Sequence, residues 1–497
     1  MNECGKSDSP AVPAKSPNKP VGAGAEVVEE KGLAEGNAAE ATRPGHSAGH
    51  KDATRGLDRV RQAAERDRKA RLTALLHHVD VDRLAAAYRV LNPDAAVGVD
   101  EVTWHEYGQD LWANLTDLHE RVHRGSYRAR PARRAYIPKS GGRLRPLGIA
   151  ALEDKIVQRA LTQVLNAVYE TDFLRFSYGC RRGSGPHDAL DALAVGLTRR
   201  KVGWVLDADI RDFFSRLDHD WLIRFVEHRI GDPRVVRLIR KWLQAGVVED
   251  GQWAKTEQGV PQGASVSPLL ANVYLHYVLD LWAHDWRRRH ATGDVIIVRY
   301  VDDFVVGFQQ YRDAARFLAD LRTRLAAFDL GLADDKTRLV EFGRFAAQRR
   351  ARRGLGRPDT FAFLGFVHFC TTTRTGRFRL GRRTIAARMA AKLRELKHEL
   401  MRRRHQSIPA QGAWLASVLR GYFAYYAVPG NIHAVDAFRK QVARLWYRAL
   451  RRRSQRTSLT WQRMSRICDR WLPKARISHP WPQQRFDART QGRSPVR

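Results

Sequence analysis

The 497-residue chain has few cysteines and no long apolar run. Its four cysteines, Cys4, Cys180, Cys370 and Cys468, are far apart and form no Cys-x-x-Cys pair. This spacing excludes a disulfide framework and a cysteine-ligated zinc site, and it fits a reducing, cytoplasmic location. Because no run of about 18 apolar residues occurs, we expect no membrane-spanning helix and no membrane partner.

Acidic residues are also scarce relative to basic ones. The chain has 53 Asp and Glu against 87 Lys and Arg, a formal net charge of +34. This excess indicates a polyanionic partner, nucleic acid first of all. Residues 374–497 hold 30 Lys and Arg and 5 Asp and Glu, a net charge of +25. Such a segment would repel itself strongly, which favours a region that binds a polyanion over an ordinary solvated surface.

The pattern of large apolar residues divides the chain into three parts. Residues 1–55 are rich in Ala, Gly, Pro, Ser and Glu, and we predict that they are disordered. Residues 56–370 mix helical and strand patterns, including a predicted strand pair at 135–137 and 144–149, which indicates an α+β fold. Residues 371–497 are basic and mainly helical in pattern.

A helix is predicted from residue 267 onward. Ser267 is its expected N-cap and Pro268 its first helical residue. Six residues then recur at helical spacing and are expected on one face, namely Leu270, Val273, Tyr274, Tyr277, Val278 and Leu281.

Two adjacent aspartates interrupt the apolar stretch VRYVDDFVVGF at residues 298–308. The pattern predicts a buried hairpin with Asp302 and Asp303 at its turn. Another apolar run, VLDADI, contains Asp207 and Asp209, which share a face because side chains alternate along a strand. Phosphoryl transfer with two Mg²⁺ ions needs a few carboxylates held together. The aspartates therefore predict such a site, with Asp207 and Asp209 as alternatives; a lone Asp-Asp pair would more simply be a polar turn.

Seven motifs resemble, in order, those of bacterial group II intron-encoded reverse transcriptase/maturases. "YVDD" (300–303) is similar to the active-site motif of that family, and "VLDADIRDFFSRLDHDWL" (205–222) to its other aspartate motif. The remaining blocks are "RPLGI" (145–149), "FSYGCRRGSGPHDAL" (176–190), "QGVPQGASVSPLLANVYLHYVLD" (258–280), "LADDKTRLVEFG" (332–343) and "FAFLGF" (361–366). The resemblance extends over about residues 98–486.

The resemblance implies a right-hand polymerase. Fingers and palm with an antiparallel sheet would occupy residues 56–370, and a helical thumb and RNA-binding maturase region residues 371–497, with no endonuclease domain. The implied activity is that of an RNA-directed DNA polymerase, a nucleotidyltransferase that uses Mg²⁺, deoxynucleoside triphosphates, an RNA template and a DNA primer. It would bind its group II intron RNA, assist splicing and copy the intron into DNA during retrohoming of this mobile genetic element. Whether the chain acts as a monomer or a dimer stays open.

The resemblance also assigns roles to single residues. Asp209, Asp302 and Asp303 match the catalytic aspartates that bind the metal ions, which favours Asp209 over Asp207. Lys336 matches a lysine proposed in related polymerases to protonate the leaving pyrophosphate, although a surface lysine is the simpler interpretation.

Four further residues match positions that contact the incoming nucleotide. Lys139 and Arg145 would hold its triphosphate, since arginine can grip phosphate bidentately and lysine acts as a point charge. Phe214 would lie under the sugar and exclude a 2′-hydroxyl group, with the adjacent Phe213 as the alternative. Gln262 would lie near the nascent base pair.

Three other functions stay open at this point. The chain could be a reverse transcriptase of the same lineage that serves a CRISPR, retron or diversity-generating system, a splicing-only maturase, or an RNA-dependent RNA polymerase. The three aspartates argue against the splicing-only function. Tyr-Val before Asp-Asp and the ring of Phe214 argue against an RNA polymerase. The long basic C-terminal helices favour the intron-encoded enzyme over its relatives.

Overall fold

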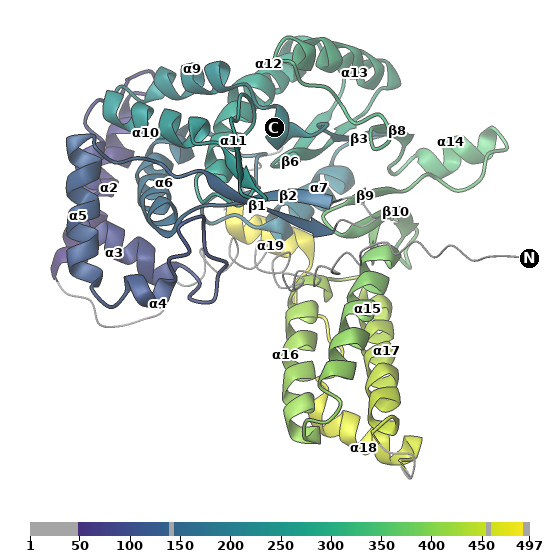
Figure 1. The fold of residues 1–497 in the computed structure, drawn as a ribbon. Coiled ribbons are helices and arrows are strands. Elements are labelled where there is room, and N and C mark those ends of the chain that lie inside the picture. The colour runs from purple at the N-terminus through teal and green to yellow at the C-terminus, as the bar shows by residue number, and fades with distance from the viewer. Residues whose placement is uncertain (1–47, 139–143, 454–458, 491–497) are drawn as a thin grey trace, which may run out of the picture.

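The computed structural model describes residues 48–138, 144–453 and 459–490. Sheets and surrounding helices form a body, from which a bundle of four helices projects (Figure 1). The predicted α+β class is confirmed by this mixture of antiparallel sheets and helices. The segment predicted to be disordered, residues 1–55, lies outside the described residues except at its end, where helix α2 (Ala48–Arg66) begins.

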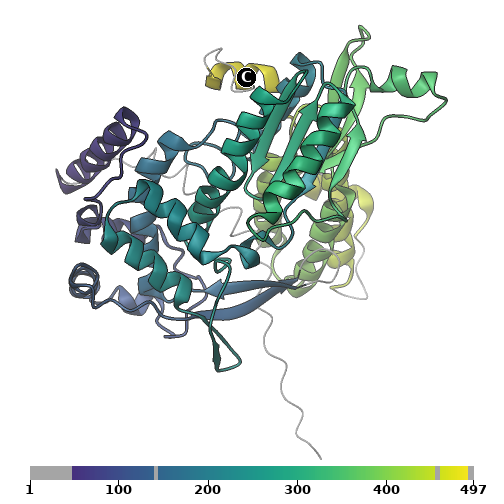
Figure 2. The same ribbon diagram turned by 90° about the horizontal axis from the view of Figure 1, so that it is seen from above.

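Helices make up the N-terminal side of the body, coloured purple in Figures 1 and 2. They are α2, the 3₁₀ turn η2 (Leu76–His78), α3 (Val81–Val90), α4 (Trp104–Tyr107) and α5 (Leu111–Arg124), followed by the long α6 (Leu152–Asp172). Twelve buried residues of α6 place it in the middle of the largest apolar core. Seen from above, this helical side lies at the opposite end of the body from the green C-terminal strands (Figure 2).

The central sheet, which we call the aspartate sheet, has four antiparallel strands in the order β6-β7-β3-β8. They are β3 (Trp204–Asp209), β6 (Val295–Tyr300), β7 (Asp303–Phe308) and β8 (Arg338–Glu341). Alternation sends residues such as Leu206 and Val306 into the core that contains α13 (Tyr311–Ala326). Val205 and Val305 point to the opposite face, where α7 (Pro186–Arg199) packs. Because both faces are covered, the strands are rigid, and the predicted hairpin at 298–308 is confirmed.

A second sheet, in the order β2-β1-β4-β5, contains the predicted strand pair. Its strands are β1 (Ala132–Pro138), β2 (Leu144–Ile149), β4 (Val247–Glu249) and β5 (Gln252–Ala254). β1 and β2 are antiparallel, as predicted, and the connection at 139–143 lies outside the described residues.

A third sheet leads from the body toward the bundle. It consists of β9 (Phe361–Phe363), β10 (Phe366–Thr372) and β11 (Phe378–Thr384) in the order β11-β10-β9. The boundary drawn from the sequence at 370/371 falls inside β10, and the bundle itself starts at residue 386.

The remaining elements are helical. In the body they are α8 (Phe213–Arg216), α9 (His219–Arg229), α10 (Pro233–Gln244), α11 (Ser267–Leu275), the π-helical turn η3 (His276–Asp280), α12 (Leu281–Arg289) and α14 (Ala346–Arg352). The C-terminal bundle consists of α15 (Ala386–Arg402), α16 (Ile408–Tyr426), α17 (Ile432–Arg451) and α18 (Trp461–Trp471), and α19 (Pro482–Thr490) returns to the body against α7 (Figure 1). Throughout the described part, no helix combines the length and the apolar character that crossing a bilayer requires.

The helix predicted from residue 267 differs from the structure in two ways. Ser267 is not the N-cap but already helical, and its hydroxyl donates to the carbonyl of Pro261 at 2.8 Å. The single helix expected is interrupted by the π turn η3, which adds a residue to one turn and rotates everything after it. Leu281, expected on the buried face, is therefore 40% exposed, whereas Asp280 is completely buried.

Asp232 joins two distant parts of the N-terminal core. It is fully buried, caps α10, and accepts hydrogen bonds from the backbone N–H groups of Leu75 and Leu76, both at 3.0 Å. Burial opposes ionisation, but the hydrogen bonds from Arg234 and these backbone groups outweigh it and lower the pKa of Asp232 to about 2. This carboxylate therefore stabilises the fold as an anion.

Replacing Asp232 should destabilise the fold measurably. Asp232→Ala removes a cap, worth about 1 kcal/mol, and leaves buried N–H groups unpaired, so the free energy of unfolding should fall by about 2–4 kcal/mol. Asp218→Ala is the control, because that residue caps α9 through one bond to Trp221 N and should cost only about 1 kcal/mol. Urea unfolding measures both. Since the folded-state pKa is depressed, the Asp232 contribution is complete above about pH 4 and is lost as the pH falls toward 2.

Candidate active site

The aspartate sheet brings the predicted carboxylates together. Asp209, the last residue of β3, lies directly opposite Asp303, the first residue of β7. Tyr300 pairs with Asp303 across the β6–β7 hairpin, so Val301 and Asp302 form its two-residue turn. The turn thus lies one residue earlier than predicted, because Asp303 already pairs as the first residue of β7. Residues that face each other on neighbouring antiparallel strands are about 4.5–5.5 Å apart at Cβ, which places Asp209 and Asp303 side by side on one face.

The electrostatics of this cluster are unfavourable in the protein alone. Burial, and then the charge of Asp209, raise the pKa of Asp302 to about 6. Burial, followed by the charges of Asp207 and Asp302, raises the pKa of Asp303 well above its usual range. Rigid strands thus hold like charges close together in a partly buried position, an arrangement that a bound cation would stabilise.

Three basic side chains from separate elements act on the charges of the cluster. The ammonium group of Lys336 forms an ion pair with Asp209. Burial lowers the pKa of Lys336, but the hydrogen bond to Asp209 and its charge outweigh this, so the pKa lies above its usual value. The charge of Arg145 in β2 partly offsets the rise in the pKa of Asp302, and the charge of Arg388 in α15 partly offsets that of Asp303. Charges from the second sheet and from the bundle therefore both contribute to the electrostatics of the aspartates.

The donor set fits a hard divalent cation, because it consists of carboxylate oxygens alone. Among the residues that the structure describes, no three His, Cys, Asp or Glu side chains gather closely enough to enclose an ion by themselves. Mg²⁺ commonly keeps water and phosphate oxygens among its ligands, so an incomplete protein shell suits it. Asp209, Asp302 and Asp303 are the residues that would hold it.

Of the predicted nucleotide residues, Lys139 lies outside the described residues, and Arg145 lies on β2, where its charge acts on Asp302. Phe213 is 1% exposed in the core, whereas the neighbouring Phe214 is only partly buried. Phe214, unlike Phe213, therefore keeps part of its surface accessible. The backbone carbonyl of Gln262 accepts a hydrogen bond from Gly148 N at 2.7 Å, which places the Gln262 loop against β2, the strand of Arg145.

Sequence reasoning missed the surroundings of Asp207. Burial raises the pKa of Asp207 to about 7, against the opposing effects of Arg338 and of a hydrogen bond from the backbone of Ala362 in β9. Asp207 is therefore held by strand β9, which packs on the aspartate sheet, and lies two residues farther from the hairpin turn than Asp209. Across the two strands, Asp209 and not Asp207 is the residue that pairs with Asp303.

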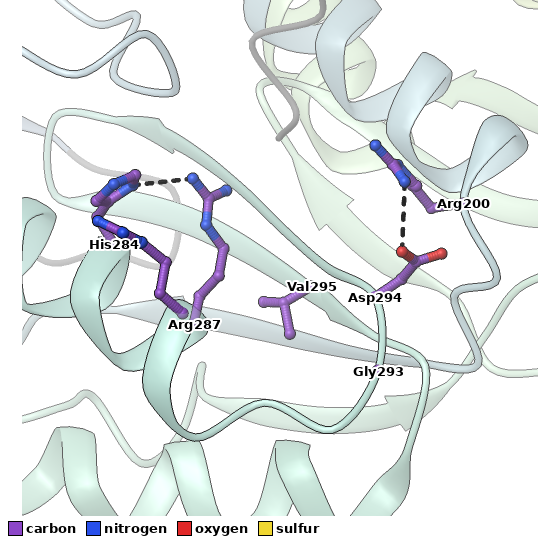
Figure 3. A pocket seen from close by; sticks show the side chains of 7 residues that line it. Arg200, His284, Arg287, Gly293, Asp294 and Val295 are labelled. Atoms are coloured by element: carbon purple, nitrogen blue, oxygen red, sulfur yellow. Dashed lines mark hydrogen bonds and ion pairs between the residues drawn. The ribbon is translucent and has the colours of Figure 1, made fainter.

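A separate cavity of about 440 Å³ lies at the other end of β6. Figure 3 shows Arg200 paired with Asp294 on one side and Arg287 beside His284 on the other. Burial and the charges of Arg287 and Arg288 lower the pKa of His284, so its neutral ring accepts a hydrogen bond from Arg287 at 2.9 Å. Since the aspartates follow the opposite end of the strand, this cavity is not part of their cluster.

The region that carries the cluster matches a protein family, and the chain is similar to several known proteins. Residues 137–368 match the family model described as "Reverse transcriptase (RNA-dependent DNA polymerase)". Protein YkfC of Escherichia coli (strain K12) is 38% identical over 237 residues, which cover 42% of this chain and 62% of that protein. Group II intron-encoded protein LtrA of Lactococcus lactis subsp. cremoris is 40% identical over 165 residues, covering 32% and 27%. The chain thus spans less than two thirds of the length of either relative.

Among solved structures, a Candida albicans telomerase in complex with a fragment of telomeric RNA aligns with a TM-score of 0.39 at 13% identity, over 73% of this chain and 67% of that one. The family match contains β2, β3, β6, β7 and all three aspartates. Together with the antiparallel aspartate sheet, it confirms the right-hand polymerase class predicted from the sequence.

Proposed function

We propose that this chain is a bacterial, group II intron-encoded RNA-directed DNA polymerase that acts in the cytoplasm. The observation that carries the proposal is the meeting of Asp209, Asp302 and Asp303 on adjacent strands, inside the segment that matches the reverse transcriptase family. Residues 56–370 would be the fingers and palm, and residues 371–497 the thumb and maturase region. Its substrates would be deoxynucleoside triphosphates, an RNA template and a DNA primer.

Each side chain of the cluster has a role in this proposal. Two Mg²⁺ ions would neutralise the charge that develops on the oxygens of the reacting phosphate. Asp209, Asp302 and Asp303 would hold these ions, because the strands fix the positions of their carboxylates. Arg145 and, by its position in the sequence, Lys139 hold the triphosphate, and Gln262 lies beside the new base pair. Lys336, already paired with Asp209, can donate a proton to the departing pyrophosphate.

The C-terminal region supports a second role, in binding intron RNA and assisting splicing. Residues 374–497 carry a net charge of +25, and most of them belong to the helical bundle that projects from the body (Figure 1). A segment with this charge suits a large folded RNA. The similarity to group II intron-encoded protein LtrA supports the same role.

Primer extension tests the proposed activity directly. The purified protein is mixed with Mg²⁺, an RNA template, an annealed DNA primer and deoxynucleotides, and full-length DNA is the expected product. Removal of Mg²⁺ with a chelator should stop synthesis, and ribonucleotides in place of deoxynucleotides should not support it. Folded protein that never extends the primer would reject the proposal. Synthesis with ribonucleotides alone would instead indicate an RNA polymerase.

Sugar selection should depend on Phe214. If the partly buried ring of Phe214 lies under the sugar, Phe214→Ala should reduce the preference for deoxynucleotides over ribonucleotides, measured as the ratio of kcat/KM values, by about 10–100-fold. Phe213→Ala is the matched control, because that ring is buried against Tyr274 and its loss should lower stability without changing selection. Relaxed selection in the Phe213 variant alone would shift the assignment by one residue.

A further inference from the structure

A completely buried arginine lies directly behind the turn that carries Asp302. Arg299 of β6 is 1% exposed, and each of the five N–H groups of its guanidinium has an acceptor. Nε and one Nη2 hydrogen bond go to the two carboxylate oxygens of Asp280, at 2.7 and 2.6 Å. The other Nη2 bond goes to Ser177 Oγ at 2.7 Å. Nη1 donates to Asn272 Oδ1 at 3.0 Å and to the carbonyl of Val301 at 2.9 Å.

The partners of Arg299 come from three different segments. Asp280 is 0% exposed and ends the π turn, whose extra residue directs this carboxylate inward. Asn272 belongs to α11, is also 0% exposed, and donates to the carbonyl of Gly179 at 2.8 Å. The segment around Ser177 pairs in parallel with the backbone of Arg299. The network therefore connects the hairpin to α11, to the π turn and to the loop before α7.

The turn held by this network has an unusual backbone. Val301 has a φ of +58°, a conformation that β-branched residues rarely adopt. Gly179 lies against it so closely that a Cβ at position 179 would be 2.6 Å from Val301 N and 2.9 Å from the carbonyl carbon of Tyr300. A turn of this kind persists only where the surrounding contacts define it fully.

We infer that Arg299, Asp280 and Asn272 are positioning residues that fix the Val301–Asp302 turn and thereby the carboxylate of Asp302. The inference rests on the proposed function and deepens it, because the network touches no nucleotide and acts through Asp302. The Arg299 guanidinium holds the Val301 carbonyl, one peptide before Asp302, and Asp280 with Asn272 hold the guanidinium. Displacement of a reacting group by about 1 Å can cost about 100-fold in rate, so a small movement of this turn is enough to matter.

The test removes the network without leaving a buried charge unpaired. The double variant Arg299→Met, Asp280→Leu deletes both charges at once, a change that folded proteins tolerate better than loss of one partner. Primer extension by this variant should show kcat lowered by about 10–100-fold, with KM for the deoxynucleotide changed by less than about threefold. Amide hydrogen exchange over residues 299–304 should become faster, and this measurement requires no polymerase activity.

A second buried pair provides the matched control. Arg229 and Asp172 are 1% and 9% exposed and 2.7 Å apart, but they lie in the N-terminal core. Arg229→Met, Asp172→Leu should lower the melting temperature by a similar amount while kcat and the exchange of residues 299–304 stay at wild-type values. Equal losses of kcat in both double variants would show that Arg299 and Asp280 contribute only to stability, and would overturn the inference.

Gly179→Ala perturbs the same turn from outside the ion pair. Its Cβ must displace Val301, so kcat should again fall more than KM rises, and exchange over 299–304 should increase. Wild-type kcat and wild-type exchange in either folded variant would reject the positioning role. If the wild-type protein itself extends no primer, the proposed function fails, whereas the exchange measurements still decide whether the network holds the turn.

Discussion

Primer extension is expected to fall by about 10³-fold or more in the Asp302→Asn and Asp209→Asn variants. Asparagine keeps the size of the side chain but removes the charge that would bind Mg²⁺.

The Asp302→Asn variant should still fold. Burial and the charge of Asp209 raise the pKa of Asp302 to about 6, so ionisation of this group opposes folding. Without divalent cations, the free energy of unfolding of the wild-type protein should decrease as the pH rises from about 4 to 6, because Asp302 ionises in the unfolded chain before it ionises in the folded protein. The Asp302→Asn variant should lose this pH dependence.

Two measurements separate this explanation from general damage. Millimolar Mg²⁺ should raise the melting temperature of the wild-type protein but not that of Asp302→Asn, since a ligand stabilises only the state that binds it. Asp207→Asn is the matched control on the same face of β3, and it should retain extension within about tenfold. Loss of extension in the Asp207 variant, with activity kept in Asp209→Asn, would show that the wrong aspartate of β3 had been assigned.

Local sequence patterns predicted the elements that carry the aspartates. The apolar runs on both sides of Asp302 and Asp303 predict a hairpin, because β-branched residues in short apolar runs around a polar pair are typical of two strands joined by a turn. The same reasoning placed Asp209 at the end of a buried strand. What the sequence could not provide was the pairing of β3 with β7, which joins residues nearly one hundred positions apart and depends on tertiary packing.

The error at residues 267–281 has the same origin. Helical spacing predicts one continuous helix through Leu281, because no local pattern marks a π turn. The buried contacts of Asp280 with Arg299 offset the free-energy cost of this turn. One signal was available, since an arginine in the otherwise apolar strand VIIVRY requires a buried acceptor. Neither its partner nor its contact with Val301 could be located without the fold.

Binding of structured RNA should depend steeply on salt if the C-terminal bundle holds the intron. Each phosphate neutralised contributes about 0.7–0.9 to the slope of log K against log salt concentration. If about 6–10 phosphates are contacted, affinity should fall by about 10³–10⁵-fold between 50 and 200 mM salt. Filter binding of labelled intron RNA at several salt concentrations measures the slope. A slope near zero would show that phosphate contacts do not carry the binding.

The slope of log K against log salt concentration should depend on where the arginines lie on the surface, and not on the net charge of the protein alone. Arg444 and Arg448 are exposed one turn apart on α17, so Arg444→Gln with Arg448→Gln should lower the slope by about 1.4–1.8. Arg312 and Arg316 are exposed with the same spacing on α13, in the body, and their double Gln variant removes the same charge. The α13 variant should bind like wild type. Equal losses of slope in both variants would show that the bundle binds RNA nonspecifically. The same conclusion would follow if excess unrelated structured RNA displaced labelled intron RNA as readily as unlabelled intron RNA does. Either result would remove the support for the splicing role.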